Sequence, residues 1–239
     1  MDGGTVTDAE LVSQIQASAA RVRSRIADAG GDPDRVRLVA VTKGHSAIAV
    51  AASAAAGLCD VGESYVQELV AKAFALESRS ALEGAEPPPV RWHFIGRLQR
   101  NKVRPAAPHV AVWQSVDRLS LAAEIAHRAP GAAVLVQVDL TQREGRGGCP
   151  PERVPAVVEG CRDLGLEVRG LMAIGRQGAT ETTRAGFRVV RDLADRLQLE
   201  ERSMGMSGDL EAAVAEGSTM IRVGTALFGP RSGRAGVGK

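Results

Sequence analysis

Short apolar and β-branched runs alternate along this chain with longer stretches of helical periodicity. Strands separated by helices pair in parallel and are buried on both faces, so this alternation leaves few possible architectures. We expect eight strands, at residues 37–42, 58–62, 91–96, 110–116, 132–140, 166–174, 202–206 and 219–223. Eight strands in 239 residues predict an α/β fold, a single (β/α)8 barrel of the TIM type, with an open doubly wound sheet as the alternative.

The stretches between the strands have the length and periodicity of helices. We expect helices at 47–56, 65–82, 101–108, 119–128, 151–164, 180–199 and 209–216. An extra helix at 9–29 precedes the first strand, and Thr7 with Glu10 forms a capping box at its start. Because we find no linker and no internal repeat, we expect one domain over 1–239: an N-terminal helix (1–36), the barrel (37–229) and a tail (230–239).

Composition and cysteine usage argue against several functions. The 30 Lys and Arg residues nearly balance 28 Asp and Glu, so the net charge of +2 does not predict nucleic-acid binding. No run reaches the ~18 apolar residues of a membrane span and no signal peptide is present, so we expect a cytoplasmic protein without membrane contact. Cys59, Cys149 and Cys161 form no CxxC pair and the histidines no HExxH motif, so we predict neither disulfides nor a metal site.

The first candidate functional residue is a lysine at the end of a strand. The C-terminal ends of the strands in a parallel barrel meet at one face, where the active sites of such barrels lie. Lys43 follows the apolar and β-branched run 39–42, so its amine should project into the barrel mouth. Such a lysine can form a Schiff base if burial lowers its pKa, whereas a solvated lysine that opens a loop is the alternative.

The last two strands end in small polar residues that could bind a phosphate. The chain leaves the eighth strand at Gly224 and enters a helical turn at Thr225, so backbone N–H groups and a hydroxyl can reach an anion. The run Ser-Met-Gly-Met-Ser at 203–207 adds similar chemistry, and the last two units of such barrels frequently share a phosphate site. The alternative is an ordinary turn, in which Ser207 or Asp209 caps the following helix.

An arginine lies beside this potential phosphate site. Arg222 precedes Gly224 by two residues, so both should face the barrel interior, although a surface or ion-paired arginine is the alternative. Opposite a pyridine nitrogen, an arginine would keep that nitrogen unprotonated and weaken the ring as an electron sink.

We interpret Glu63 and Glu68 as capping and helix-surface residues, with general acid–base catalysis as the alternative. No G-x-S-x-G elbow or P-loop is present.

Several longer motifs at the strand ends and loops belong together. They are LVAVTK at 38–43, DVGESYVQEL at 60–69, WHFIGRLQRNKVRP at 92–105, SVDRL at 115–119, LVQVDL at 135–140, RGLMAI at 169–174 and SMGMSGDLEAAVAEGSTMIRVGTALFG at 203–229. With these motifs the sequence resembles the pyridoxal phosphate homeostasis proteins, single-domain relatives of the barrel half of bacterial alanine racemases. The match covers nearly the whole barrel, and it implies a fold type III barrel that binds pyridoxal 5′-phosphate (PLP).

The resemblance also implies roles for individual residues. Lys43 matches the lysine that forms an aldimine with PLP, and Arg222 matches the arginine that faces the pyridine nitrogen. The phosphate-binding positions of the family fall on Ser203, the backbone of Met204, Gly224 and Thr225.

Three positions depart from the family pattern. The usual G-E-N-Y is Gly-Glu-Ser-Tyr here, so Ser64 replaces a longer asparagine near the cofactor. His45 stands where a second lysine often follows the Schiff-base lysine, which leaves a transfer role for that second lysine in doubt. Arg146 stands at a frequent lysine of the fifth strand-to-helix loop, where it keeps the charge but cannot form an imine.

Two functions of different classes remain. The first is a protein without catalytic turnover that holds PLP as a lysine aldimine, buffers its free aldehyde and delivers it, with apo PLP-dependent enzymes as possible recipients. The second is a small amino-acid racemase. Two-base racemases of this fold take a tyrosine from a second, β-rich domain, whereas Tyr65 is the only tyrosine here and only 230–239 follow Gly229. We therefore expect a binding protein rather than an enzyme.

Overall fold

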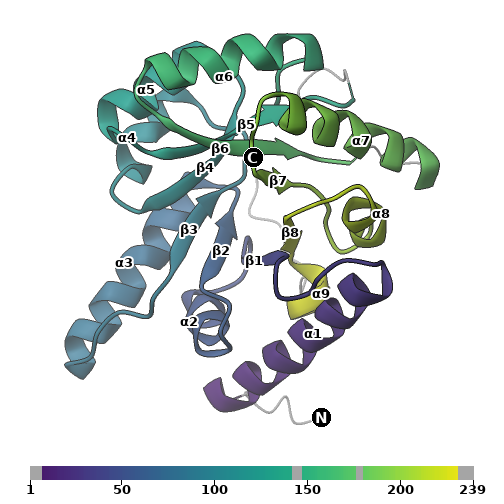
Figure 1. The fold of residues 1–239 in the computed structure, drawn as a ribbon. Coiled ribbons are helices and arrows are strands. Elements are labelled where there is room, and N and C mark those ends of the chain that lie inside the picture. Colours follow the sequence, from purple (N-terminus) through teal and green to yellow (C-terminus); the bar gives the residue numbers. More distant parts are fainter. Residues whose placement is uncertain (1–6, 142–146, 176–179, 231–239) are drawn as a thin grey trace, which may run out of the picture.

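The eight strands form a closed parallel barrel in the computed structural model, which describes residues 7–141, 147–175 and 180–230 (Figure 1). Neighbouring strands pair in sequence order, and β1 pairs with β8 to close the barrel. The (β/α)8 prediction is therefore confirmed, and the open-sheet alternative is wrong. The strands are β1 (Arg37–Val41), β2 (Asp60–Glu63), β3 (Arg91–Phe94), β4 (Val110–Val116), β5 (Ala133–Val138), β6 (Glu167–Ala173), β7 (Glu201–Ser203) and β8 (Met220–Val223).

Helices surround the barrel, and the extra N-terminal helix α1 packs against α2, α8 and α9. The predicted capping box at its start is present, since the Glu10 backbone N–H donates to Thr7 Oγ1 and the Thr7 N–H donates to the Glu10 carboxylate. The helices are α1 (Asp8–Asp28), α2 (Ala47–Ala55), α3 (Val66–Glu83), η1 (Arg100–Lys102), α4 (Val103–Ala106), α5 (Leu119–Arg128), η2 (Pro151–Arg153), α6 (Val154–Asp163), α7 (Thr180–Arg196), α8 (Leu210–Ala215) and α9 (Thr225–Phe228).

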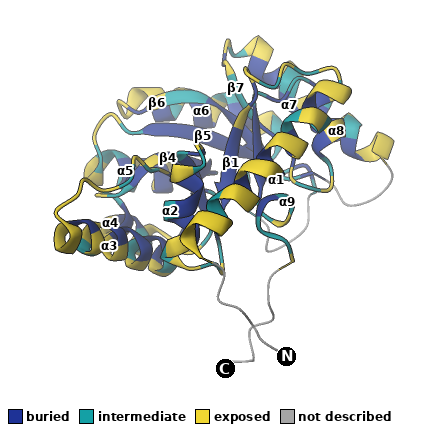
Figure 2. Cartoon of the chain, turned by 90° about the horizontal axis from the view of Figure 1, so that it is seen from below, coloured by how far each residue is buried: buried dark blue, intermediate teal, exposed yellow. Residues whose placement is uncertain are grey.

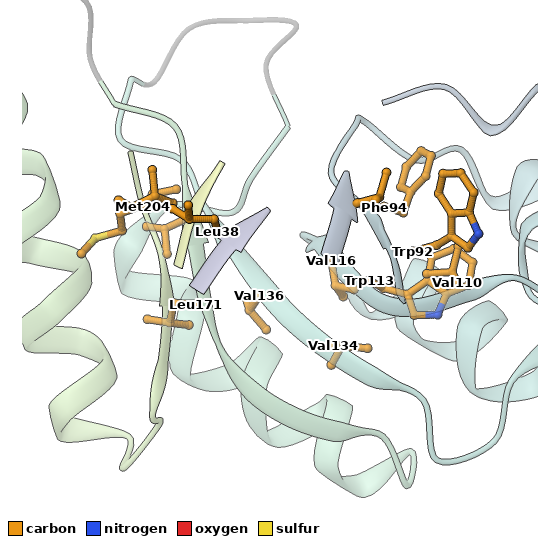
Figure 3. Close-up of a cluster of buried hydrophobic side chains, with 14 of the residues drawn as sticks. Leu38, Trp92, Phe94, Val110, Trp113, Val116, Val134, Val136, Leu171 and Met204 are labelled. Carbon is orange, nitrogen blue, oxygen red and sulfur yellow. The ribbon is translucent and has the colours of Figure 1, made fainter. Parts of the chain in front are cut away.

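Side chains on alternate sides of each strand build two separate apolar groups. Figure 2 shows the buried residues on the strands and on the inner sides of the helices, with exposed residues on the outer helix surfaces. The large group lies between the barrel and the helices and includes Trp92, Phe94 and Trp113 (Figure 3). The small group lies inside the barrel, where Leu135 and Met172 pack together. The rest of the interior therefore has room for polar side chains.

The largest difference from the predicted strands occurs at the seventh. We predicted a strand at 202–206, whereas β7 ends at Ser203. Gly205 has a φ of +90°, a left-handed conformation that ends the extended backbone, and a Cβ there would lie 2.5 Å from Ala213 Cβ. The chain thus leaves the barrel wall early. Its next residues, Met206 and Ser207, reach the barrel mouth instead of extending the strand.

Candidate functional site

A hollow of about 260 Å³ opens at the C-terminal face of the barrel, where β1, β7 and β8 end. None of the described residues that line it is acidic, whereas three of them carry basic side chains. The hollow therefore favours a ligand with negative charge. The lining residues are Val41, Lys43, His45, Ile95, Met206, Ser207, Gly208, Arg222, Gly224, Thr225 and Gly229.

Four of the predicted site residues meet in this hollow. Lys43 is half-buried directly after β1, Arg222 and Gly224 come from the end of β8, and Thr225 is exposed in the first turn of α9. Space beside Gly224 is limited, because a Cβ at this position would lie 3.2 Å from Val41 O. The glycine thus permits close approach of the end of β8 to the end of β1.

Both neighbours of Lys43 in the chain donate hydrogen bonds to carboxylates. Thr42 Oγ1 donates to Glu63 Oε1 at 2.7 Å, and the Gly44 N–H donates to Glu68 Oε2 at 2.8 Å. Glu63 is completely buried, so its interpretation as a capping or helix-surface residue is wrong. Burial raises the pKa of Glu63, and hydrogen bonds from Lys72 and Thr42 oppose that shift.

Arg222 points into the barrel, and its guanidinium donates to neutral oxygens. Nη1 donates to Ser203 O at 2.7 Å and to Ser203 Oγ at 2.6 Å, while Nη2 donates to Ala173 O at 2.7 Å. Only 4% of Arg222 is exposed, so the surface alternative is wrong. Burial lowers the pKa of Arg222 to about 10, and the nearby Asp209 partly offsets this effect. Arg222 consequently keeps its proton at neutral pH.

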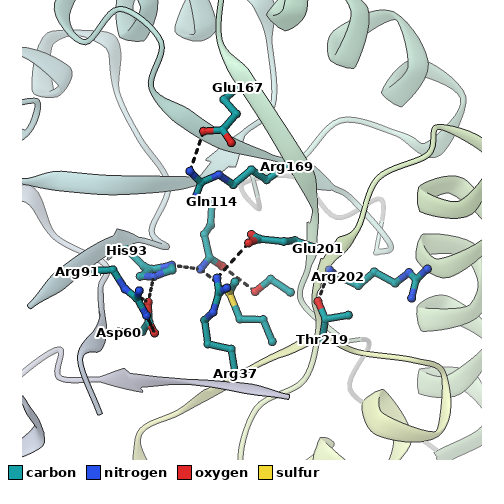
Figure 4. Close-up of polar contacts among 12 residues, drawn as sticks. Arg37, Asp60, Arg91, His93, Gln114, Glu167, Arg169, Glu201, Arg202 and Thr219 are labelled. Atoms are coloured by element: carbon teal, nitrogen blue, oxygen red, sulfur yellow. Dashed lines mark hydrogen bonds and ion pairs between the residues drawn. The ribbon is translucent and has the colours of Figure 1, made fainter. Parts of the chain in front are cut away.

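A chain of hydrogen bonds continues from Arg222 across the barrel interior. Ser203 Oγ donates to Gln114 Oε1 at 2.7 Å, and Gln114 Nε2 lies 2.7 Å from His93 Nδ1. His93 Nε2 lies 2.8 Å from Asp60 Oδ1, and Asp60 pairs with Arg91 (Figure 4). Since the Gln114 amide N–H₂ only donates, His93 must accept at Nδ1 and donate from Nε2 to Asp60. The chain thus fixes one histidine tautomer.

Asp60 carries the charge at the far end of this chain. Burial alone would raise the pKa of Asp60, but hydrogen bonds from His93 and Arg91 outweigh it and lower that pKa to about 2. Arg91 is largely exposed, whereas His93 and Gln114 are completely buried. Asp60 therefore joins the solvent-exposed N-terminal end of the barrel to its polar interior.

Ser203 and Met204 are not among the described residues that line the hollow. The Ser203 hydroxyl is completely buried and is used by Gln114 and Arg222. The Met204 N–H donates to Met220 O at 3.2 Å, and Met204 O accepts from Ser218 Oγ at 2.8 Å. Both residues thus take part in the barrel's own hydrogen bonding. A phosphate contact from either residue stays a prediction.

Met206, Ser207 and His45 also line the hollow. The sequence placed Met206 and Ser207 at the potential phosphate site only as part of the run 203–207, and it identified His45 only as a departure from the family pattern. Ser207 Oγ accepts from the Ala226 N–H at 3.2 Å, so this hydroxyl bonds to the start of α9. Asp209 precedes α8 without a side-chain cap and instead accepts from the Met206 N–H at 2.6 Å. The alternative, in which the side chain of either residue caps α8, is therefore wrong.

The three departures from the family pattern lie in different places. His45 lines the hollow, and its ring packs on Phe228 with 4.8 Å between centroids. Ser64 is half-buried directly after β2 and does not line the hollow. Arg146 lies outside the described residues.

Within residues 7–141, 147–175 and 180–230, no group of three or more His, Cys, Asp or Glu side chains could hold a metal ion. No helix in those ranges is long and apolar enough to cross a membrane. Cys59, Cys149 and Cys161 are free thiols, and burial raises the pKa of both Cys149 and Cys161 to about 11. These two thiols are therefore protonated at neutral pH.

Comparison with known proteins gives consistent relatives over most of the chain. The family described as "Alanine racemase, N-terminal domain" matches residues 12–232. A pyridoxal phosphate homeostasis protein of Pseudomonas aeruginosa is 42% identical over 94% of this chain and 96% of its own length. The pyridoxal phosphate homeostasis protein of Escherichia coli K12 is 35% identical over 92% of this chain and 98% of its own length. The structure of PipY from Synechococcus elongatus with PLP bound has 36% identity and a TM-score of 0.73, covering 87% of this chain and all of PipY.

Proposed function

Since the chain belongs to the family of pyridoxal phosphate homeostasis proteins, we propose that it binds PLP in the hollow between β1, β7 and β8 and maintains a reversible store of the cofactor. The family resemblance seen in the sequence is confirmed by these relatives. The observation that carries the proposal is the meeting of Lys43, Arg222, Gly224 and Thr225 in one hollow, whose described lining residues include no acidic one.

The residues of the hollow fit the three parts of PLP. When bound, PLP supplies an aldehyde that reacts reversibly with amines, a pyridine ring that can withdraw electrons, and a phosphate. Lys43 would hold the aldehyde end, and Arg222 would donate to the ring nitrogen. The Thr225 hydroxyl and the backbone at Gly224 would hold the phosphate. These assignments use all three kinds of group on the ligand.

The setting of Arg222 favours storage over turnover. An arginine that keeps its proton leaves the ring nitrogen as an acceptor, so the ring stabilises a carbanion poorly. The alternative function, racemisation of an amino acid, also needs an acid–base group opposite Lys43. Tyr65 does not line the hollow and is 59% exposed. We propose that the protein binds and delivers PLP without robust catalysis.

Access to the hollow supports delivery. Lys43 is half-buried and Thr225 is exposed, so an amine from another molecule can approach the bound aldehyde end. Apo PLP-dependent enzymes are the proposed recipients, and the proposed setting is the cytoplasm. Transfer would then exchange the lysine of this protein for a lysine of the recipient.

The proposal is tested by reducing the protein with borohydride after incubation with PLP. We expect a permanent label on the peptide that contains Lys43, and we expect Lys43→Ala to abolish it. Lys102→Ala is the matched control, because Lys102 is also half-buried but does not line the hollow. A label that stays in Lys43→Ala and disappears in Lys102→Ala would overturn the assignment.

A second measurement separates storage from racemisation. The loaded protein should restore the activity of an apo PLP enzyme, while deuterium from solvent should not enter the α-position of alanine or serine. Lys43-dependent deuterium incorporation with inversion would instead establish a racemase.

A further inference from the structure

Lys72 of α3 is a buried lysine that the proposed PLP contacts do not use. It is 7% exposed, and its Nζ lies 2.8 Å from Thr42 O, 2.5 Å from Glu63 Oε1 and 3.4 Å from Glu68 Oε2. A buried ammonium is unfavourable unless its donors are satisfied. All three of its acceptors belong to residues around the end of β1. The cluster therefore lies beside the residue that precedes Lys43 in the chain.

The Lys72 cluster holds the peptide groups on each side of Lys43. On the N-terminal side, Thr42 donates its hydroxyl to Glu63 and accepts at its carbonyl from Lys72. On the C-terminal side, the Gly44 N–H donates to Glu68, the second carboxylate around Lys72. Gly44 has a φ of +77°, so the chain bends directly after Lys43.

We propose that Glu63, Glu68 and Lys72 form a clamp that positions Lys43 for covalent capture of the PLP aldehyde. The inference rests on the proposed function, because it concerns the same lysine. In the capture, neutral Lys43 Nζ adds to the aldehyde carbon, and the carbonyl oxygen leaves as water with the two amine hydrogens. Lys72 and Glu68 contact the backbone of Thr42 and Gly44, and Glu63 contacts the Thr42 hydroxyl, so all three act through the neighbours of Lys43 and are positioning residues.

The clamp makes physical sense because a lysine side chain has many rotamers. Fixing the backbone on both sides restricts where Nζ can be found relative to the ligand, which raises the effective concentration of the amine at the aldehyde. The clamp contacts reach Thr42 and Gly44, so they fix the place from which the Lys43 side chain extends.

The test compares PLP with pyridoxine 5′-phosphate, which has a hydroxymethyl group in place of the aldehyde and cannot bond covalently to Lys43. The variant is Glu68→Gln in the full chain, and Arg79→Met on the same helix is the control, since Arg79 pairs only with Glu83 and Asp8 among the described residues. We expect Glu68→Gln to slow borohydride-trapped labelling of Lys43 about fivefold, because the bond to Gly44 loses its charge assistance.

Binding of pyridoxine 5′-phosphate, measured by equilibrium dialysis, should stay unchanged in Glu68→Gln, and Arg79→Met should match the wild type in both measurements. Lys72→Met should show a larger slowing. If Lys72→Met does not fold, Glu68→Gln decides alone, because its carboxylate is partly exposed and its size is kept.

Two results would overturn the clamp while leaving the proposed function in place. One is wild-type labelling of Lys43 in Glu68→Gln, and the other is an equal loss of affinity for both ligands, which would indicate damage to the hollow itself. Failure of the wild-type protein to label Lys43 at all would instead overturn the proposed function, so the two failures can be told apart.

Discussion

Lys43 and Arg222 face the same hollow, but the barrel holds them in opposite ways. Around Lys43 the contacts come from the charged side chains of Glu63, Glu68 and Lys72. They reach the hydroxyl and carbonyl of Thr42 and the N–H of Gly44. Around Arg222 the contacts are neutral oxygens of Ser203 and Ala173, and they reach the side chain itself.

The difference follows from what each side chain must do. A lysine that captures and releases an aldehyde has to change protonation and rotamer, so support from its neighbours in the chain suits it. An arginine that keeps a ring nitrogen unprotonated must stay in one place, so its donors are bound to oxygens that do not titrate. Labelling of Lys43, on the β1 side, should therefore change with substitutions that alter loop geometry. The free energy of unfolding should change most with substitutions that break the interior hydrogen-bond chain behind Arg222, on the β8 side.

The largest effect is expected for Gln114→Leu, which interrupts the chain behind Arg222. Leucine leaves the Ser203 hydroxyl and His93 Nδ1 without their buried partners, so the free energy of unfolding should fall by about 2–4 kcal/mol. Urea unfolding measures this change. Labelling of Lys43 by PLP and borohydride should persist in the variant where it is folded, since the β1 side is untouched.

Gln137→Leu is the control for Gln114→Leu. Gln137 is a buried glutamine of β5. Its side chain donates one hydrogen bond within the described part of the chain, to Gly147 O at 2.8 Å. Its loss should cost about 1 kcal/mol. Equal losses for the two glutamines would show that the interior chain adds nothing beyond a single hydrogen bond, and the contrast between the two sides would then disappear.

A smaller effect is expected at the charged end of the chain. The pKa of Asp60 is about 2 in the fold and 3.8 ordinarily, so its stabilising contribution is complete above the ordinary value and disappears as pH falls through the folded value. Compared with Asp60→Asn, the wild type should be more stable by about 1–2 kcal/mol at about pH 5, and this advantage should shrink toward pH 2. Urea unfolding at several pH values measures it, and a difference that does not vary with pH would contradict the assignment.

The residues of the hollow were predictable because they depend on strand ends. Lys43, Gly224 and Thr225 follow clear apolar runs, and the C-terminal ends of barrel strands always share one face. The inward direction of Arg222 followed from its spacing to Gly224. Neither inference needs the exact length of a strand or the packing of its neighbours.

The supports of these residues were not predictable, because they depend on register. We expected the second strand at 58–62, whereas β2 spans Asp60–Glu63, and this shift places Glu63 inside the fold rather than at a helix cap. At the seventh strand, the left-handed Gly205 decides that Ser203 stays in the wall while Ser207 reaches the hollow. A sequence pattern does not show which of several glycines adopts that conformation.

The smallest change in stability is expected for Gly44→Ala, and it isolates the β1 side. Gly44 (φ +77°) and Gly57 (φ +84°) both have left-handed backbones, so alanine at either should lower the free energy of unfolding by about 1 kcal/mol. Gly57 follows α2 and a Cβ there meets nothing within 4 Å, so Gly57→Ala reports the backbone strain alone. Relief of the same strain at Gly44 rotates the N–H that donates to Glu68, so only Gly44→Ala should slow borohydride-trapped labelling of Lys43. Equal labelling rates in the two variants, with equal losses of stability, would mean that the bend after Lys43 is a feature of the loop and not part of the lysine's support.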